Sequence, residues 1–451
     1  MSVAHIKRFQ ERWDADDRFR AAVAQDPQAA VEYYGICIDP HAVRPLWDKE
    51  LAHLKEDEQA RHRQFPLLKE YDEYIRSLTR RDILSRVDAS TNPGYRAWRR
   101  RQVARTAAQF PKAHQDRLIH LGLVLELTKG CSVGCWFCGL AAPRLQGVFA
   151  YTRRNAALWR KTLEAMRDTL GPAAGSGICY WATEPFDNPD YESFCADFAD
   201  ILGVFPQTTT ARPLADPART RAMMRLSLEK GCTHNRFSVT SLRMLDRLHK
   251  EFSAEELRHV LLLVYSKTSD RGIAVSGRAT AQRSRPLRKD YKFSTEATIA
   301  CASGFLINMV ERTVELITPC VVSRRWPLGY RVYDRATFDN AKLLKDRVEG
   351  MIQEHMPVGF PAGRALKFRP DLKFRELEDG FEVYTQYMTR RFHNHPYLRD
   401  LGKLILKGTK TPAEVASILE FYMAPADLVQ QAIDLVFENG VLDEGPSHRG
   451  R

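Results

Sequence analysis

The sequence contains no apolar run that approaches the roughly 20 residues a membrane-spanning helix needs. Its first 18 residues are polar and lack the hydrophobic core of a secretion signal. These two absences predict a cytoplasmic protein that does not engage a membrane.

Cysteines are few, and nothing in their spacing indicates a disulfide framework. Nine occur in 451 residues, and three of these fall within eight positions. This usage suits a reducing compartment, where thiols serve metals and catalysis. Two Cys-x-x-Cys pairs, the usual pattern of a structural zinc site, are also missing.

Length and composition are those of an ordinary globular protein of about two to four domains. The net charge of +12 indicates a surface that attracts polyanions, either nucleic acid or an acidic peptide. Because the basic residues are scattered, we expect most of them to be solvated. The main exception is the cluster Arg278, Arg283, Arg285, Arg288 and Lys289.

The most informative stretch is a short loop with three cysteines that follows the apolar run at 121–127. The cysteines are Cys131, Cys135 and Cys138. Thiolates are the ligands that iron-sulfur clusters and zinc select. Three of them leave one metal position open for a ligand that is not protein. A 4Fe-4S cluster fits this count, because three of its irons are held by cysteines and one iron is open.

This spacing, with Phe137 before the third cysteine and Gly139 after it, resembles the radical S-adenosylmethionine (SAM) superfamily. The resemblance implies a 4Fe-4S cluster on the three cysteines, whose open iron chelates the amino and carboxylate groups of SAM. Phe137 and Gly139 are then expected beside the cofactor. A zinc knuckle is the alternative reading.

From residue 121 onward, short apolar runs alternate with helical segments, which predicts βα units and a parallel sheet. We expect strands at 121–127, 178–182, 208–211, 237–240 and 261–265, and a first helix at 155–170. The fold class is therefore α/β. The resemblance implies a partial (β/α)6 barrel with its chemistry at the carboxyl ends of the strands.

The second expected strand ends in a turn that partly matches the Gly-Gly-Glu-Pro-like turn of radical SAM proteins, which binds the SAM ammonium. The matching residues are Thr183, Glu184 and Pro185. A carboxylate suits an ammonium through a charge-assisted hydrogen bond, although Glu184 also reads as a helix-start carboxylate. The nearby Asp187 and Asp190 are candidates to position substrate.

At the end of the fourth expected strand, the superfamily commonly binds the ribose and carboxylate of SAM. The candidate residues there are Arg236, Ser238 and Thr240.

Two apolar stretches around a charged turn, 305–309 and 313–317, predict a hairpin with Cys301 and Cys320 at its two bases. The layout is similar to the first half of the SPASM/twitch auxiliary-cluster domains of peptide-modifying radical SAM enzymes. No cysteine follows Cys320 to complete a set of four. We therefore expect a hairpin remnant without an intact second cluster.

The hairpin, the turn at 181–191 and the stretch at 324–334 together resemble the proteusin-type peptide epimerases of ribosomally synthesised and post-translationally modified peptides (RiPPs). The resemblance implies that a 5′-deoxyadenosyl radical removes an α-hydrogen from a precursor peptide, and that a thiol returns hydrogen to the opposite face. An L-residue thereby becomes a D-residue. Cys320 is the first choice for this donor and Cys301 the second; the alternative for each is a small buried hydrophobe.

The N-terminal residues 1–118 are expected to be helical. Within residues 1–60, the order of Phe9, Trp13, Asp26-Pro27 and Tyr33-Tyr34-Gly35 is similar to helical leader peptides of the nitrogen-fixation-associated type. A plain helical cap is the alternative.

Residues 366–451 combine an expected hairpin across Glu378-Asp379-Gly380 with helices, one of which begins at the capping box Thr411 to Glu414. This order resembles the RiPP recognition element, a winged helix that binds a leader peptide by strand addition. A DNA-binding winged helix is less favoured because the helices carry few basic residues. The remaining boundaries are 119–295 for the barrel and 296–354 for the hairpin and its helix.

The implied partners are a precursor peptide and a reductant such as flavodoxin or ferredoxin. Three alternatives stay open: a radical SAM enzyme that forms a crosslink or thioether, one that acts on RNA, and a leader-binding scaffold without catalysis.

Overall fold

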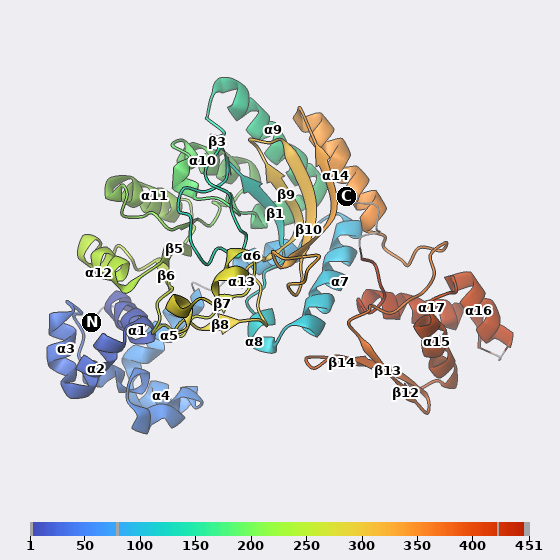
Figure 1. Cartoon of the computed structure of the whole chain (residues 1–451), viewed down its shortest axis with the longest axis horizontal. Coiled ribbons are helices and arrows are strands. Elements are labelled where there is room, and N and C mark those ends of the chain that lie inside the picture. The colour runs from blue at the N-terminus through green and yellow to red at the C-terminus, as the bar shows by residue number, and fades with distance from the viewer. Residues whose placement is uncertain (1–2, 78–80, 422–423, 446–451) are drawn as a thin grey trace.

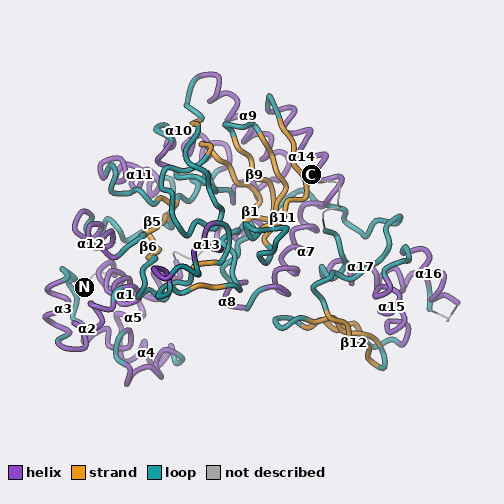
Figure 2. Tube along the Cα trace, viewed as in Figure 1, coloured by secondary structure: helices purple, strands orange, loops and turns teal. Residues whose placement is uncertain are grey.

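The computed structural model describes residues 3–77, 81–421 and 424–445 and is an α/β protein (Figure 1). The N-terminal part is helical, strands and helices mix in the central part, and a small sheet with three helices ends the chain (Figure 2). In Figure 1 the N-terminal helices and the C-terminal domain lie on opposite sides of the central part. In the ranges that the structure describes, no helix is long and apolar enough to cross a membrane.

The N-terminal part is built on a core of its own, which includes Phe9 and Phe19. Its helices are α1 (Val3–Ala15), α2 (Asp17–Gln25), α3 (Pro27–Tyr33), η1 (Pro40–Leu46), η2 (Lys49–Lys55), α4 (Glu58–Gln64) and α5 (Pro66–Ser77). The expected start of α3 is confirmed, because the Asp26 carboxylate accepts the N–H of Ala29 at 3.0 Å and Pro27 occupies the first turn.

Buried basic side chains of α1 attach this part to the central part. Lys7 donates to the carbonyl of Leu257 at 3.1 Å, and Arg8 donates to the carbonyl of Phe252 at 2.6 Å. Such contacts are what a helical cap requires. The resemblance of α1 to α3 to a leader peptide stays a prediction.

The central part contains a four-stranded sheet in the order β1-β9-β10-β11, in which β1 and β9 are parallel and the other pairs antiparallel. Its strands are β1 (Leu121–Glu126), β9 (Ala302–Asn308), β10 (Thr313–Pro319) and β11 (Tyr330–Thr337). A parallel sheet follows beyond β1 and consists of β4 (Thr209–Thr210), β5 (Asn235–Val239) and β6 (Val260–Val264). One small two-stranded sheet is formed by β2 (Thr128–Lys129) and β3 (Gly147–Val148). A second is formed by β7 (Ile273–Ala274) and β8 (Phe293–Ser294).

Helices surround these sheets. They are α6 (Arg81–Asp88), α7 (Pro93–Gln109), α8 (Lys112–Gln115), α9 (Arg153–Leu170), η3 (Gly171–Ser176), η4 (Pro185–Asp187), α10 (Tyr191–Leu202), α11 (Pro217–Glu229), α12 (Leu242–Glu251), α13 (Arg278–Gln282), η5 (Pro286–Arg288) and α14 (Ala341–His355). The expected helix at 155–170 is thus confirmed as α9, which ends where Gly171 adopts a φ of +61°.

The expected hairpin forms as β9 and β10, but it does not stand apart from the barrel region. β9 pairs with β1 over nearly its whole length, and all seven of its residues are buried. A strand that is buried throughout is typical of the interior of a sheet. The boundary expected at residue 296 therefore cuts through one sheet, and the stretch at 324–334 contributes the start of β11.

The strand expected at 178–182 is reduced to a single bridge between Val124 and Ile178. The chain leaves the sheet after this bridge, because the Ala182 N–H donates to the Glu126 side chain at 2.7 Å instead of to a neighbouring strand. The strand expected at 208–211 is likewise short, whereas those at 237–240 and 261–265 are confirmed within two residues.

The β1 strand separates two apolar clusters. Leu123 and Leu125 face the larger cluster, with Trp159 of α9 and Leu344 of α14. We call this the outer face of the sheet. Val124 faces the other cluster, which also contains Trp181, Leu306, Ile317 and the partly buried Cys301. We call this the inner face.

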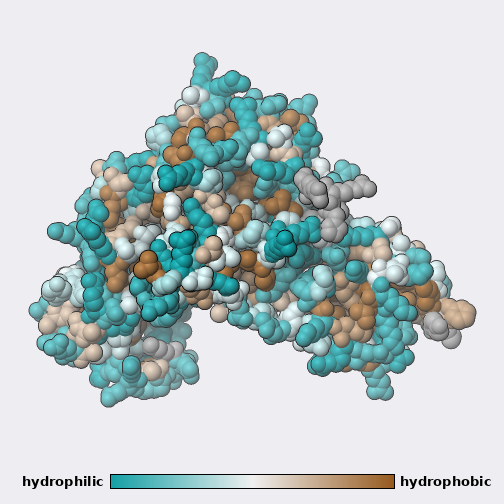
Figure 3. Space-filling view, viewed as in Figure 1, coloured by the Kyte–Doolittle hydropathy of each residue, from teal (hydrophilic) through white to brown (hydrophobic). Residues whose placement is uncertain are grey.

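The C-terminal domain (residues 366–445) has a separate apolar core. It consists of an antiparallel sheet in the order β12-β13-β14 and three helices, namely β12 (Lys373–Leu377), β13 (Gly380–Tyr384), β14 (Thr389–Phe392), α15 (Pro396–Lys407), α16 (Pro412–Phe421) and α17 (Ala426–Glu438). The hairpin and the capping box at Thr411 are confirmed, but β14 was not expected, because its sequence Thr-Arg-Arg-Phe carries little apolar signal. In Figure 3 hydrophobic residues show on this domain between hydrophilic ones.

We predict that Gly304→Ala disrupts the pairing of β1 with β9. A Cβ at this position would lie 2.1 Å from the carbonyl oxygen of Gly122, and neither backbone can withdraw without breaking the sheet. Overpacking of this kind costs about 1–3 kcal/mol or more of the free energy of unfolding, which denaturant unfolding followed by tryptophan fluorescence measures.

The matched control is Gly350→Ala on the exposed side of α14, where a Cβ meets nothing within 4 Å. There alanine should leave stability unchanged or raise it by about 0.5–1 kcal/mol. Equal stabilities of the two variants would contradict the packing argument.

Candidate cofactor and substrate site

The three cysteines lie on the loop that follows β2, and all three are partly exposed. The loop is held by its own backbone: the Cys131 N–H donates to the carbonyl of Pro143 at 2.9 Å, and the Cys138 N–H donates to that of Cys135 at 3.2 Å. Gly130 and Gly134 adopt φ values of +84° and +65°, which side chains rarely tolerate. The loop thereby presents three thiols from a short, tightly turned stretch.

The thiols influence one another electrostatically. Burial, with smaller contributions from the neighbouring Cys138 and Cys131, raises the pKa of Cys135 to about 11, and the cation of Arg278 acts in the opposite direction. Burial also raises the pKa of Cys131, and the carboxylates of Glu184 and Asp187 add to this effect. A positive group bound to these thiols, such as a metal centre, would favour their thiolate forms.

Two observations test which group the loop fits. The guanidinium of Arg278 faces Cys135, and its Nε and Nη2 atoms are buried without a hydrogen-bond partner, so they are available to an anionic cluster. Among the described residues, the only trio of His, Cys, Asp or Glu ligand atoms within 4.8 Å of one another is Asp334, Glu354 and His355.

The three sulfurs are therefore not gathered as closely as the roughly 3.8 Å between thiolates that share one tetrahedral zinc. A shared zinc ion would require the loop to contract. Separate irons of one iron-sulfur cluster, each held by its own cysteine, suit the wider arrangement better.

Asp187 connects this loop to the turn after residue 180. Its side chain is 1% exposed, and its carboxylate accepts the Ser132 N–H at 2.7 Å and the Ser132 hydroxyl. Arg212 pairs with Asp187 at 3.1 Å and donates to the Ser132 hydroxyl at 2.9 Å. Asp187 thus holds the cysteine loop, whereas Asp190, the other substrate candidate, accepts the Tyr151 N–H at 2.8 Å.

Glu184, with Thr183 before it and Pro185 after it, lies at the start of η4 and is 2% exposed. Its carboxylate accepts hydrogen bonds from the Thr210 hydroxyl, the Ala211 N–H at 2.8 Å and the Phe186 N–H at 3.2 Å. Burial raises its pKa, against the effect of these donors. These contacts are those of a carboxylate at the start of a helix, and the binding of the SAM ammonium by Glu184 stays a prediction.

The residues expected at the end of β5 alternate as a half-buried strand should. Arg236, Ser238 and Thr240 are partly exposed, while Phe237 and Val239 between them are buried. The side chains of Arg236 and Cys135 both influence the pKa of Tyr265, just after β6, so this open face lies beside the cysteine loop.

Phe137 and Gly139 also connect the loop to its surroundings. The Phe137 ring lies 4.7 Å from that of Tyr265. A Cβ at Gly139 would lie 2.6 Å from the Ser276 hydroxyl and 2.8 Å from Ile299, so only glycine allows this approach.

The two donor candidates lie on different faces of the sheet. Cys301 packs in the inner cluster, where it raises the pKa of Tyr180. Cys320 is 2% exposed and is influenced by Arg331 and Arg105, and α7, which carries Arg105, packs on the outer face. Burial raises the pKa of Cys320 to about 11. Cys320, the first choice for the donor, therefore lies apart from the inner cluster that contains Cys301, and the donor role of either cysteine stays a prediction.

Cys179, Cys195 and Cys232, the other cysteines of the barrel region, are all buried in the larger apolar cluster. They pack on the outer face among aromatic and aliphatic side chains, away from the inner cluster that contains Cys301.

Sequence reasoning missed Glu126, the last residue of β1. It is 8% exposed and accepts hydrogen bonds from the Ala182 N–H at 2.7 Å and from the Asn308 side chain at 3.0 Å. Burial raises its pKa to about 7, with smaller contributions from Glu315 and Glu311. The sequence did contain a signal for this site, because Glu126 is an acidic residue that interrupts the apolar run 121–127.

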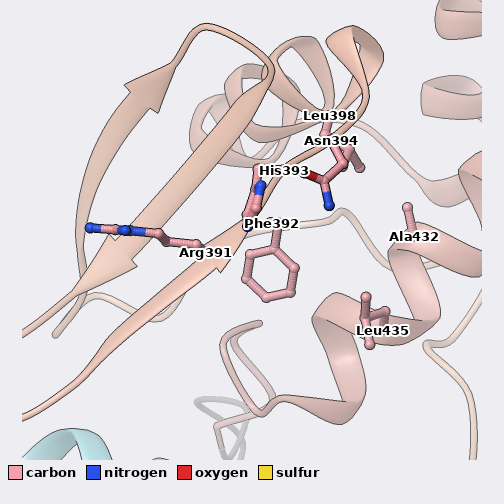
Figure 4. A pocket seen from close by; sticks show the side chains of 7 residues that line it. All are labelled: Arg391, Phe392, His393, Asn394, Leu398, Ala432 and Leu435. Carbon is pink, nitrogen blue, oxygen red and sulfur yellow. The ribbon is translucent and has the colours of Figure 1, made fainter.

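A groove of about 190 Å³ lies in the C-terminal domain between β14 and α17 (Figure 4). β14 is an edge of its sheet, so its outward backbone groups are available for pairing. The groove is lined by Arg391, Phe392, His393, Asn394, Leu398, Ala432 and Leu435. Leu435 is 53% exposed although it is a large apolar side chain.

Together these features define an α/β protein with a three-cysteine loop, and comparison with known proteins adds a family. The chain is 37% identical over 454 residues to a protein of Sinorhizobium fredii (strain NBRC 101917 / NGR234) named "Uncharacterized protein y4wI", an alignment that covers 98% of this chain and 88% of the relative. The chain belongs to the family of that protein. No family model matches.

A comparison with solved structures finds the crystal structure of BtrN in complex with AdoMet and 2-DOIA. The match has 12% sequence identity and a TM-score of 0.32, and it covers 52% of this chain and 82% of that chain. A similarity at this level carries no argument about this chain.

We predict that Asp187→Asn impairs metal loading of the cysteine loop. The substitution removes the charge that pairs with the partly exposed Arg212 and leaves one oxygen for the two Ser132 donors, and the loss of hydrogen bonds to a charged group costs about 1.5–3 kcal/mol. After anaerobic reconstitution, iron and sulfide per chain should fall several-fold relative to the unchanged protein. Asp200→Asn, which alters an exposed pair with Lys230, is the control and should load normally. Normal loading of both variants would show that Asp187 does not hold the loop.

Proposed function

We propose that this protein is a radical SAM enzyme that epimerises residues of a ribosomally synthesised precursor peptide. The observation that carries the cofactor part is the trio of mutually interacting thiols beside Arg278, whose buried donors have no partner. Cys131, Cys135 and Cys138 would hold a 4Fe-4S cluster. Bound there with SAM, the cluster supplies reductive cleavage of SAM to a 5′-deoxyadenosyl radical.

The residues around the loop would position SAM. Glu184 would accept its ammonium through an oxygen lone pair that the three present donors leave free. Arg236, Ser238 and Thr240 form the open polar side of β5 and would bind its ribose and carboxylate. Phe137 and Gly139 would shape the adjacent surface, and Asp187 keeps the loop and the Glu184 turn in register.

Cys301 is the better candidate for the hydrogen donor, in place of Cys320. It lies on the inner face with Tyr180 and Ala182, the segment that leads to the Glu184 turn. The thiol S–H bond would break and a C–H bond would form on the peptide α-carbon, leaving a thiyl radical. One electron and one proton, delivered from a reductant such as flavodoxin or ferredoxin, would restore the thiol.

The C-terminal domain would bind the precursor's leader. An extended peptide can add to the exposed edge of β14 through backbone hydrogen bonds, while apolar side chains enter the groove beside Leu435. The exposed apolar surface and the free edge occur at the same place, which favours this role over nucleic-acid binding.

The decisive experiment is an anaerobic reaction of the reconstituted protein with SAM, reductant and a co-supplied precursor peptide in deuterium oxide. Epimerisation adds about one mass unit per site, because an exchangeable thiol returns the hydrogen. Cys131→Ala, Cys135→Ala or Cys138→Ala should abolish formation of 5′-deoxyadenosine, because the cluster cannot assemble. Cys301→Ala should retain that formation and lose deuterium incorporation.

The control for the donor is Cys320→Ala, which should still incorporate deuterium. If Cys301→Ala also incorporates it, the thiol assignment is wrong. A loss of about two mass units would replace epimerisation with a crosslink.

Leader binding is tested by Leu435→Glu, which places a charge in the groove beside β14. We expect the affinity for a fluorescent precursor peptide, measured by anisotropy, to fall at least about tenfold, which corresponds to about 1.4 kcal/mol. Leu406→Glu is the matched control, because Leu406 on α15 is 54% exposed and does not line the groove. Equal affinities of the two variants would argue against leader binding in this groove.

A further inference from the structure

Four arginines gather where α7, the start of β11 and the C-terminal domain meet. Arg101 and Arg105 of α7 are each 1% exposed, Arg369 is 2% exposed, and Arg331 of β11 is partly buried. Arg105 and Arg331 both influence the Cys320 thiol, so both lie in its neighbourhood. Neither the cofactor site nor the leader groove uses these residues.

The guanidinium of Arg105 has no hydrogen-bond partner on any of its three nitrogens, and all three are buried. The Nη1 atom of Arg101 and the Nε atom of Arg331 are buried and unpartnered as well. Arginine stays protonated in proteins and cannot shed its charge. Because buried donors without acceptors are costly, an acceptor that residues 3–77, 81–421 and 424–445 do not provide is required here.

The carboxylates nearby are already engaged. Arg369 and Gln109 bind Asp371 at 2.6 Å and 3.0 Å, and Arg101 and Gln102 each bind Glu444 at 2.8 Å. The third, Asp443, accepts the N–H of Gly445 at 3.0 Å. Asp371 and Glu444 are thus paired with Arg369 and Arg101, and no carboxylate of the described chain forms a hydrogen bond with the Arg105 guanidinium, whose positive charge stays unpaired.

Neighbouring titratable groups do not offset that charge. Burial raises the pKa of the Cys320 thiol to about 11 and also raises the pKa of the Tyr333 hydroxyl, so both are neutral near pH 7. Tyr333 instead donates to the side-chain oxygen of Gln102 at 3.2 Å.

We propose that Arg101, Arg105 and Arg331 hold one small inorganic anion, of the class of chloride or phosphate, between the central part and the C-terminal domain. Five unpartnered N–H-bearing atoms from α7 and β11 supply its donors. Because Arg101 and Arg369 also bind the C-terminal segment, the anion helps to seat the C-terminal domain on α7. The site does not depend on radical chemistry.

The test uses the full chain with its metal loaded, in gluconate buffer free of chloride and phosphate. Sodium chloride, sodium phosphate and sodium sulfate are added separately at constant ionic strength, and the midpoint of thermal unfolding is recorded. Saturation with the ligand that fits should raise the midpoint by about 2–5 °C. The three arms distinguish a halide from an oxyanion.

Arg105→Gln should abolish that rise, whereas Arg335→Gln, which alters an exposed arginine paired with Glu315, should retain it. A rise of equal size in Arg105→Gln would overturn the proposal, as would the absence of any anion effect in the unchanged protein. The second outcome would mean that waters alone satisfy the donors.

A direct measurement does not depend on the variant folding. Crystals of the unchanged protein soaked in sodium bromide, or grown with phosphate, should show an anomalous or difference peak within hydrogen-bond distance of the Arg105 guanidinium. Water-sized density there under all of these conditions would exclude the anion.

Discussion

The parallel pairing of β1 with β9 is the interaction on which the arrangement of the central part depends. It joins two segments just over 180 residues apart, and it requires the close approach of Gly304 to the backbone of Gly122. The N–H of Leu121 donates to the carbonyl of Cys301 at 2.9 Å, so the same pairing sets the height of Cys301 relative to β1. The cysteine loop follows the other end of β1. The pairing of β1 with β9 therefore relates the position of Cys301 to that of the cysteine loop.

The two faces of this sheet differ in the ionisable groups that lie near them. On the inner side, the Glu126 carboxylate and the Cys131 and Cys135 thiols are partly or wholly buried, and burial raises their pKa values. On the outer side, guanidinium groups accumulate near Cys320.

Local signals predicted much of the fold because they act over a few residues. Asp26-Pro27 and the Thr411 to Glu414 capping box start helices where expected, and the apolar run at 121–127 forms β1. By contrast, β14 is short and charged, and the run after Ile178 bends away because Glu126 captures a backbone N–H. The formation of β14 and the bend after Ile178 depend on residues that are distant in the sequence, and the periodicity of apolar residues does not reveal such contacts.

The sequence by itself determined the three-cysteine loop, because ligand type and spacing are local and limit what can bind there. It also determined the α/β class through the alternation of apolar runs. Only the tertiary structure placed the two hairpin cysteines in different surroundings. Cys301 and Cys320 are equivalent as bases of a hairpin, but β9 joins β1 and brings Cys301 into the inner cluster, whereas Cys320 is buried near Arg331 and Arg105. The same packing gathered Arg101, Arg105 and Arg331 from distant segments, since burial and unpaired charge are properties of the assembled fold.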